Sequence, residues 1–572
     1  MMLRYGATAP GLEMLYIALG ATGSIALTIY TYTLYSGLIL TMQLPGFESH
    51  IDIWVALAAT ISLVVVAAMA YPDRYFGTKS RPDLPGPRGI PLLGNLIQLL
   101  PHRKRMLFYL AELEHQYGEL FTFTMPGWGR NIVINRPEWL EHTRKQDGVG
   151  YGKGPTALAM FRQFPGVSSA FSTEGTRWKA SRQVTKPIFI SKTFDSHVSR
   201  AMSEIVPVAK ELLTSAAKDG LEVDFDNFCG RIVLAIFCKT SMSVETNMLT
   251  SDPACLSTPD RMMDAVMTLN HISSGRLYDP LWQITEIFTG TRRAFNLVRS
   301  ELYDIVNNII QDRKMSCEDK GDFLSTLLSD SSLGAKDPDF LRDTLVTLLF
   351  ASRDNTQNVL GWSLYEMSRK PEWFDKMREE ALALKDLDGE VTRYGELSKY
   401  HIHLAVFYET LRLWPGVPKN ARLALRDDVL PAIPEYGYGP VRISKGDYIL
   451  WSDFSMMRNP KVTPHTLIDS MSLKGKNNIQ VWGSDATDFN PARHLDAEGK
   501  FIKPSQPKFH AFGSGPRLCP GAQLSAYEFV AIWAAFLPSF DFKPVEMKDR
   551  LPTDALTMSM QGPFMITVES RA

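Results

Sequence analysis

The stretch FGSGPRLCPG, residues 512–521, decides the fold class and carries the sharpest chemical signal in the chain. Its glycines and prolines favour a tight loop without regular structure, and Arg517 places a cation inside that loop. Residues 522–537 continue with a helical pattern, so Cys519 is predicted to lie at a helix N-terminus, where the pKa of a thiol is lowered. Phe512 is placed to shield the sulfur. The pattern indicates a protected thiolate.

A protected thiolate beside a cation suits an axial ligand of haem iron, whereas a lone cysteine most often packs in a core. The spacing favours the ligand, because five fixed residues in this order occur by chance in roughly one chain in ten thousand of this size. Phe512, Gly515, Arg517, Cys519 and Gly521 resemble the F-x-x-G-x-R-x-C-x-G haem-binding signature of the cytochrome P450 monooxygenases. The resemblance implies a mainly α-helical domain with small β-sheets. It also implies haem b bound through Cys519, with Phe512 and Arg517 against the cofactor.

Two motifs before this loop resemble further elements of the same family. The sequence ETLR at 409–412 resembles the E-x-x-R helix motif, and FNPAR at 489–493 resembles the F-x-P-x-R element that follows it. The resemblance implies that Glu409, Arg412 and Arg493 form a buried ion network, since buried charges are tolerated only when they are paired. The implied role is structural, because the network would fix the loop beneath the haem.

A third motif concerns the carboxylate groups of the cofactor. The sequence WKASR at 178–182 resembles the family's W-x-x-x-R, and the spacing puts Trp178 and Arg182 on one face of a helix. The resemblance implies that both bind a haem propionate, and that Arg422 is another propionate-binding residue. Without the resemblance, each arginine would be interpreted as a solvated surface cation.

Residues 351–356, ASRDNT, lie in a helix predicted over 341–368 and resemble the oxygen-binding A-G-x-D-T-T motif with two departures. Ser352 replaces the usual glycine. Asn355 occupies the position of the usual threonine, and Thr356 follows. In the family, the acid and the threonine deliver protons to bound O₂ through water, but asparagine cannot relay a proton as a hydroxyl does. We expect Asp354, Asn355 and Thr356 to share the catalytic role.

The first 75 residues predict a membrane anchor. Met14–Phe47 and Ile53–Tyr71 contain no charged side chain, and each is long enough to span a bilayer. One or two transmembrane helices are therefore expected, at about 14–42 and 53–71. A signal peptide and a buried core helix are the alternatives, which the lengths disfavour. The positive-inside rule places the N-terminus and the catalytic domain in the cytosol, because the flanking basic residues are Arg4, Arg74, Lys79, Arg81 and Arg88. The hinge and anchor resemble the microsomal type of the family, which implies the endoplasmic reticulum membrane.

We interpret residues 76–91 as a proline-rich hinge and residues 92–572 as one catalytic haem domain. The chain has 572 residues, 45% apolar and 22% charged, with a formal net charge of −1. This composition supports a large core and excludes the basic excess typical of nucleic-acid binders. The five cysteines are scattered, so neither a disulfide framework nor a zinc site is expected. Helical patterns cover 108–117, 198–217, 292–314, 341–368 and 372–384, and strand patterns cover 120–124, 132–134, 441–443 and 564–568.

The resemblance implies a haem-thiolate monooxygenase that inserts one oxygen atom of O₂ into a C–H bond of a hydrophobic substrate. The chain shows no flavin or nicotinamide fold, so NADPH-derived electrons would come from a partner, a membrane-bound NADPH–cytochrome P450 reductase. Residues 350–354 and 420–427 look similar to fungal members that hydroxylate alkyl chains, which favours a long-chain fatty acid or alkyl substrate. The alternatives are an oxidase of a terpenoid or polyketide intermediate in secondary metabolism and, more remotely, a non-catalytic haem-binding membrane protein.

Overall fold

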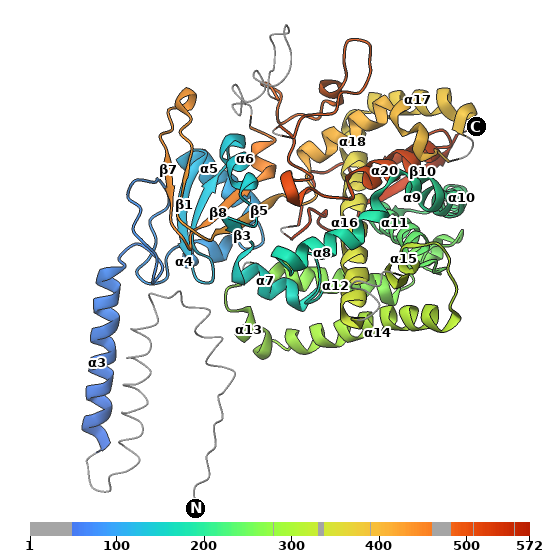
Figure 1. The fold of residues 1–572 in the computed structure, drawn as a ribbon. Helices are drawn as coiled ribbons and strands as arrows, with labels where there is room; N and C mark the ends of the chain where they lie inside the picture. The colour runs from blue at the N-terminus through green and yellow to red at the C-terminus, as the bar shows by residue number, and fades with distance from the viewer. Residues whose placement is uncertain are drawn as a thin grey trace, which may run out of the picture.

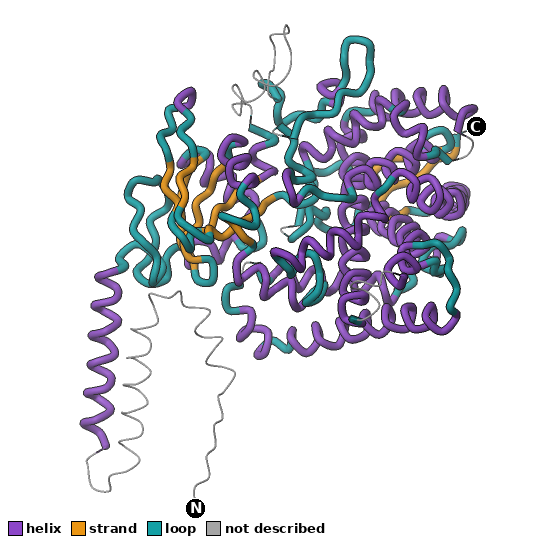
Figure 2. The backbone as a smooth tube through the Cα atoms, in the orientation of Figure 1, coloured by secondary structure: helices purple, strands orange, loops and turns teal. Residues whose placement is uncertain are grey.

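The computed structural model describes residues 49–277, 279–329, 337–388, 391–459, 482–506, 508–553 and 555–571. Helices make up most of the body, and most strands gather on one side of it (Figures 1 and 2). The longer helices are α3 (Ser49–Ala70), α5 (Met106–Tyr117), α8 (Gly175–Thr185), α10 (Ser199–Asp219), α11 (Phe225–Met242), α12 (Arg261–Gly275), α14 (Thr291–Ser316), α16 (Pro338–Arg369), α17 (Glu372–Asp388), α18 (His401–Leu413) and α20 (Ala522–Phe536). The shorter helices are α4 (Leu96–Leu99), α6 (Pro137–Lys145), α7 (Gly154–Gln163), α9 (Ser191–Thr193), α13 (Trp282–Phe288), α15 (Phe323–Ser329) and α19 (Asp453–Met456).

The largest sheet has five strands in the order β1-β2-β8-β5-β3 and joins segments that are far apart in the chain. β1 and β2 form an antiparallel hairpin, β8 adds parallel to β2, and β5 pairs antiparallel with β8. A second sheet has the order β4-β10-β9, and β6 pairs with β7. The strands are β1 (Leu120–Met125), β2 (Gly129–Ile134), β3 (Tyr151–Gly152), β4 (Val223–Asp224), β5 (Lys419–Ala424), β6 (Asp428–Leu430), β7 (Val441–Ile443), β8 (Tyr448–Ser452), β9 (Phe540–Pro544) and β10 (Met565–Ser570).

Helix α16 runs through the helical part of the body (Figure 1). Asp337 caps its start, accepting hydrogen bonds from the backbone N–H groups of Asp339 (3.0 Å) and Phe340 (3.2 Å). Pro338 occupies the first turn, where its missing N–H costs nothing. One apolar core cluster joins α16 to α10, α11, α18 and α20, and another joins it to α12, α14 and α15. Packing on several sides explains why this helix is buried along most of its length.

The expected fold class, mainly α-helical with small sheets, is confirmed. The helix predicted over 341–368 is α16, and the strand predicted over 441–443 is β7. The strands β5 and β8 escaped prediction because their pairing depends on partners distant in sequence.

The N-terminal part of the described chain is the helix α3, which projects from the body (Figure 1) and overlaps the second expected span at 53–71. Its apolar side chains are exposed, with Val66 at 63% and Met69 at 76%. The first expected span, 14–42, lies outside the described residues. Measured over the described part of the chain, no helix combines the length and hydropathy needed to cross a bilayer. The transmembrane anchor therefore stays a prediction.

The proline-rich segment at 76–91 forms no helix and lies against the five-stranded sheet. The backbone N–H of Thr122 in β1 donates to Pro85 O (2.9 Å), and Gly89 N–H donates to Asp73 O (3.1 Å). Gly86 passes so close to Thr122 that a Cβ at position 86 would overlap the Thr122 carbonyl. These contacts join the end of α3 to the body through a segment that is itself packed.

Candidate active site

The loop that contains Cys519 borders a cavity of about 530 Å³ between the five-stranded sheet and the helices. Cys519 lies deep in the molecule, yet its side chain is exposed because it faces this cavity. Phe512 and α8 contribute further wall, and α16 borders the cavity from Thr344 to Thr356. The cavity therefore joins three sequence motifs, at 178–182, 351–356 and 512–521, that are far apart in the chain.

The backbone of the 512–521 loop is closed by its own hydrogen bonds. Cys519 N–H donates to Phe512 O (2.9 Å), and Leu518 N–H donates to Gly515 O (3.1 Å). Helix α20 begins at Ala522, three residues after the cysteine, as the helical pattern predicted. This arrangement holds the sulfur at the cavity edge and at the start of a helix.

The expected lowering of the Cys519 pKa is wrong for the protein alone. Burial raises the pKa of the Cys519 thiol, and this outweighs the lowering by the backbone N–H groups of Gly521 and Ala522 and by the charge of Arg182. A bound metal cation deprotonates a coordinating thiol outright. The thiolate therefore depends on the iron, and the helix N-terminus only assists.

The nearby cations are arranged differently from the expectation. Arg182, on α8, acts on the sulfur, and its Nη2 donates to Leu518 O (2.8 Å). Arg517 is not among the charges that act on Cys519, and its guanidinium lies 3.9 Å from the centre of the Trp178 ring. The structure thus brings Trp178 and Arg182 to the cavity on one helix face, with Arg517 stacked on the tryptophan.

Arg517 and Arg422 share one carboxylate, that of Asp147. Arg422 Nε donates to Asp147 Oδ2 (2.9 Å), and Arg517 Nε donates to Asp147 Oδ1 (3.4 Å). The β5–β8 pairing brings Arg422 here, opposite Ile449. Sequence reasoning missed Asp147, because an aspartate before a glycine-rich loop carries no motif of its own.

This edge of the cavity has more positive than negative charge. Burial, together with the charges of Arg517 and Arg422, lowers the pKa of Lys153 to about 7. Arg517 Nη1 is buried without a hydrogen-bond partner among the described residues. Carboxylate groups of a ligand would balance the excess positive charge and would accept a hydrogen bond from Arg517 Nη1. The site therefore fits haem, with Cys519 placed to hold the iron and the cations placed to hold propionates.

Of the three residues expected to handle protons, two border the cavity and one does not. Asn355 and Thr356 border the cavity, while the Asp354 carboxylate turns toward α12. Asp354 Oδ1 accepts from Arg353 Nη1 (2.7 Å), and Oδ2 accepts from Asn270 and from Thr557 Oγ1 (3.2 Å). Asp354 is thus connected to the cavity through Thr557, which itself borders it.

Asn355 forms a hydrogen bond within its own helix and has no hydroxyl with which to relay a proton. Its Nδ2 donates to Ala351 O (3.2 Å), one turn back on α16. Its Oδ1 lies against Gly416, where a Cβ would overlap it. A glycine at position 416 is therefore required for the observed position of the carboxamide.

Thr356 carries a hydroxyl that the structure connects to a buried acid. Its Oγ1 donates to Glu528 Oε2 on α20 (2.8 Å) and lies 3.2 Å from Ser525 Oγ. Burial raises the pKa of Glu528 to about 8, so this carboxyl can carry a proton near neutral pH. Sequence reasoning missed Glu528, since the contact between α16 and α20 is tertiary. Its only sequence signal was a single acid in an apolar helix.

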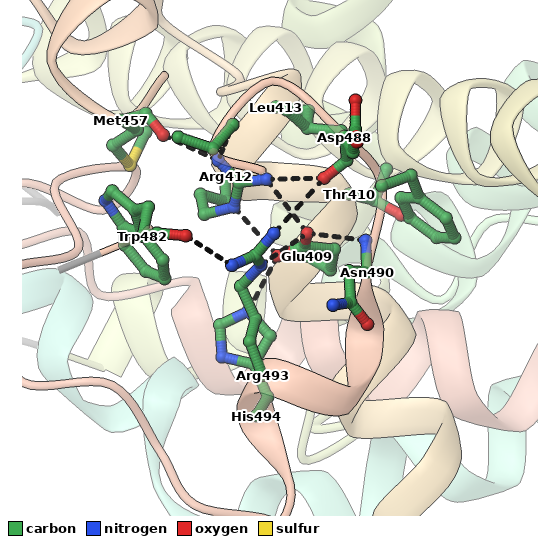
Figure 3. A network of polar contacts seen from close by, with 12 residues as sticks. Glu409, Thr410, Arg412, Leu413, Met457, Trp482, Asp488, Asn490, Arg493 and His494 are labelled. Carbon is green, nitrogen blue, oxygen red and sulfur yellow. Dashed lines mark hydrogen bonds and ion pairs between the residues drawn. The ribbon is translucent and has the colours of Figure 1, made fainter. Parts of the chain in front are cut away.

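The residues of the expected ion network lie together (Figure 3), and none of Glu409, Arg412 and Arg493 borders the cavity. Glu409 is fully buried and accepts from Arg412 Nε (2.8 Å) and Nη2 (2.9 Å) and from Arg493 Nε (3.0 Å). Asn490 N–H (2.8 Å) and His494 Nε2 (3.1 Å) complete its contacts. Burial alone would raise the pKa of Glu409, but Arg412 and His494 hold it well below its usual range. His494 was not anticipated from the sequence.

Comparison with known proteins agrees with this site. Residues 84–466 and 471–568 match the sequence model of cytochrome P450. The chain belongs to the cytochrome P450 family. It is 31% identical over 558 residues to the cytochrome P450 monooxygenase cyp1 of Mycosarcoma maydis, covering 93% of this chain and 82% of the relative. It is 25% identical over 504 residues to cytochrome P450 94A1 of Vicia sativa, covering 85% and 90% of the two chains.

A second fungal relative is the cytochrome P450 monooxygenase pvhE of Talaromyces variabilis, 26% identical over 480 residues, with 80% of this chain and 82% of the relative covered. Family membership confirms the expected enzyme class, a monooxygenase, and the expected cofactors, haem b and O₂ with NADPH-derived electrons from a partner. It disfavours the alternative of a non-catalytic haem-binding protein.

Proposed function

We propose that this cytochrome P450 hydroxylates a C–H bond of a long aliphatic substrate, such as a fatty acid or another alkyl chain. The observation that carries the proposal is the composition of the wall that α16 and the 157–171 segment contribute. Every residue from these two elements that borders the cavity is uncharged, which suits an apolar molecule. These residues are Ala157, Phe161, Ala170, Phe171, Thr344, Thr347, Leu348, Phe350, Ala351, Ser352, Asn355 and Thr356.

The haem, when bound, supplies the activation of O₂, and the protein supplies binding, orientation and proton handling. Cys519 would hold the iron. Trp178, Arg182, Arg422 and Arg517 would hold the propionates, and Phe512 would contact the cofactor. Around the oxygen site, Asn355 orders water and Thr356 passes protons from Glu528, which replaces the direct hydroxyl relay at position 355. Asp354 contributes to proton delivery through its hydrogen bond with Thr557. The Glu409, Arg412 and Arg493 network stays structural.

The proposed location is the endoplasmic reticulum membrane, with the catalytic domain facing the cytosol. The support is the exposed apolar surface of α3, together with the basic residues that follow it, Arg74, Lys79, Arg81 and Arg88. A membrane-bound NADPH–cytochrome P450 reductase is the proposed electron donor, because it would be bound to the same membrane as this protein.

The second candidate is oxidation of a terpenoid or polyketide. Hydroxyl and amide groups also border the cavity, among them Thr240, Ser241, Ser352 and Asn355, and these would suit an oxygenated substrate. The experiment is turnover with NADPH and a reconstituted reductase, with fatty acids of increasing length and a terpenoid set supplied separately. Product from alkyl substrates alone supports the proposal. Product from terpenoids alone refutes it in favour of the second candidate.

A further inference from the structure

Ala170 and Phe171, in the segment from Phe164 to Thr173, border the cavity, and the side chain of Lys153 attaches to this segment with all of its donors. Lys153 Nζ donates to Ala170 O (2.7 Å), Phe171 O (2.7 Å) and Thr173 O (3.0 Å). An ammonium group has three donors and no acceptor. All three are therefore directed to one stretch of four residues.

The ring held in this way is Phe171. It stacks on Phe161 with ring centres 5.6 Å apart and meets Phe350 of α16 edge-on at 6.1 Å. All three rings border the cavity. Because Lys153 bonds the carbonyl groups of Phe171 and its neighbour Ala170, it fixes the backbone that carries the ring. Such aromatic pairs depend on geometry as well as on buried area.

The earlier part of the same segment is attached to α16 instead. Ser168 N–H donates to Asp343 Oδ2 (2.9 Å), and Thr347 Oγ1 donates to Ser169 Oγ (2.7 Å). Lys153 lies just before α7, N-terminal to this segment, and holds the later part of the segment. The wall segment is thus held at residues 168–169 by α16 and at residues 170–173 by the ammonium group.

The position is electrostatically costly for a lysine. Among the described residues Lys153 forms no ion pair, although Glu174 and Asp147 act on it from nearby. The charges of Arg517 and Arg422 oppose it, and burial adds to the cost. An apolar residue would avoid this cost, but it could not supply three hydrogen bonds to carbonyl groups. A function in holding the wall accounts for a cation at this place.

We propose that Lys153 is a positioning residue for the substrate. Its ammonium group fixes the backbone around Phe171, and the ring then determines how tightly the cavity holds an apolar molecule long enough to reach this wall. The inference concerns binding only, so it stands or falls separately from the proposed hydroxylation.

The test uses the full-length haem protein and two ligands whose imidazole nitrogen binds the iron. 1-Methylimidazole stays close to the iron, whereas 1-dodecylimidazole carries an alkyl chain into the cavity, and both are titrated by the shift of the haem absorption band. Lys153→Met should weaken 1-dodecylimidazole binding about tenfold, as expected for the loss of at least one hydrogen bond to a charged group. It should leave 1-methylimidazole binding unchanged. Lys153→Arg, which keeps charge and donors, should retain most of the affinity for the long ligand.

Two further variants separate the inference from general damage. Lys179→Met removes an exposed lysine on α8 and should change neither titration. Phe171→Ala keeps Lys153 but removes the ring, and it should reproduce the selective loss even if Lys153→Met fails to take up haem. The inference is overturned if Phe171→Ala leaves 1-dodecylimidazole binding intact. It is also overturned if Lys153→Met weakens both ligands equally or neither of them.

Discussion

Replacing Glu409 by glutamine is the sharpest test of how this fold supports its haem loop. The substitution keeps the shape and one carbonyl oxygen but removes the charge. In the structure that charge is shared by Arg412 and Arg493, and Arg412 is fully buried. Glutamine would leave Arg412 buried without its counter-charge (Figure 3).

The magnitude follows from this burial. Breaking a buried ion pair by neutralising one partner costs about 3–5 kcal/mol, because the other charge stays desolvated. A folded protein is stable by only about 5–15 kcal/mol in total. We therefore expect Glu409→Gln to lower the free energy of unfolding by about 3–5 kcal/mol and to reduce the fraction of protein that takes up haem.

The assay is urea unfolding followed by tryptophan fluorescence, with the reduced, carbon-monoxide-bound spectrum reporting the fraction with a cysteine-bound haem. The matched control is Glu569→Gln, which breaks the ion pair with Lys543 in which both side chains are 59% exposed. Exposed pairs contribute about 0–1 kcal/mol. The reasoning would be refuted if Glu409→Gln destabilised the protein by no more than this control and left haem uptake unchanged.

The same network predicts how the stability contributed by Glu409 changes with pH. The folded-state pKa of Glu409 is lowered, so its stabilisation is fully present above the unfolded value of about 4.3. It is lost as the pH falls through the folded pKa. Glu409→Gln should therefore be nearer to wild-type stability in strong acid than at neutral pH.

Five further predictions concern the cavity and the anchor. Cys519→Ala should abolish the thiolate-type band of the reduced, carbon-monoxide-bound protein, and a wild-type protein without this band would contradict the haem assignment. Gly416→Ala should displace the Asn355 carboxamide, cost about 1–3 kcal/mol through overpacking and release more peroxide per NADPH. Asn355→Ala should also raise peroxide release, and unchanged coupling would contradict its assignment. The raised pKa of Glu528, about 8, means that stability falls as the pH rises from about 4 to 8, because the unfolded chain loses this proton first. Glu528→Gln should flatten that fall in a urea titration repeated across pH, and an unaltered profile would contradict it. Removal of residues 1–75 should move the protein from the membrane fraction to the supernatant of a cell lysate, and an unchanged distribution would argue against the anchor.

Local sequence was sufficient where the chemistry is local. The closed loop around Cys519, the start of α20 and the Trp178–Arg182 helix face each depend on residues within about ten positions of one another. Their geometry follows from turn residues and helical periodicity. The long helix α16 was predictable for the same reason, from its periodic pattern over 341–368, although its capped start lies three residues earlier, at Pro338.

Tertiary contacts decided the electrostatics of the site. The pKa of Cys519 rises because burial outweighs the helix N-terminus, and burial is a property of the whole fold. Asp147 and Glu528 became site residues only because β5 pairs with β8 and α16 packs on α20. No spacing in the sequence indicates either contact.

By itself, the sequence determined the family, the expected haem ligand and the residue types available for chemistry, since a motif of fixed spacing needs no long-range information. Only the tertiary structure decided which cation acts on the Cys519 sulfur, which acid accepts the hydrogen bond of Thr356 and which backbone carbonyl groups Lys153 binds. These are questions of desolvation and of distances between segments far apart in the chain. Both depend on how helices and strands pack, and packing is a cooperative result of the entire sequence.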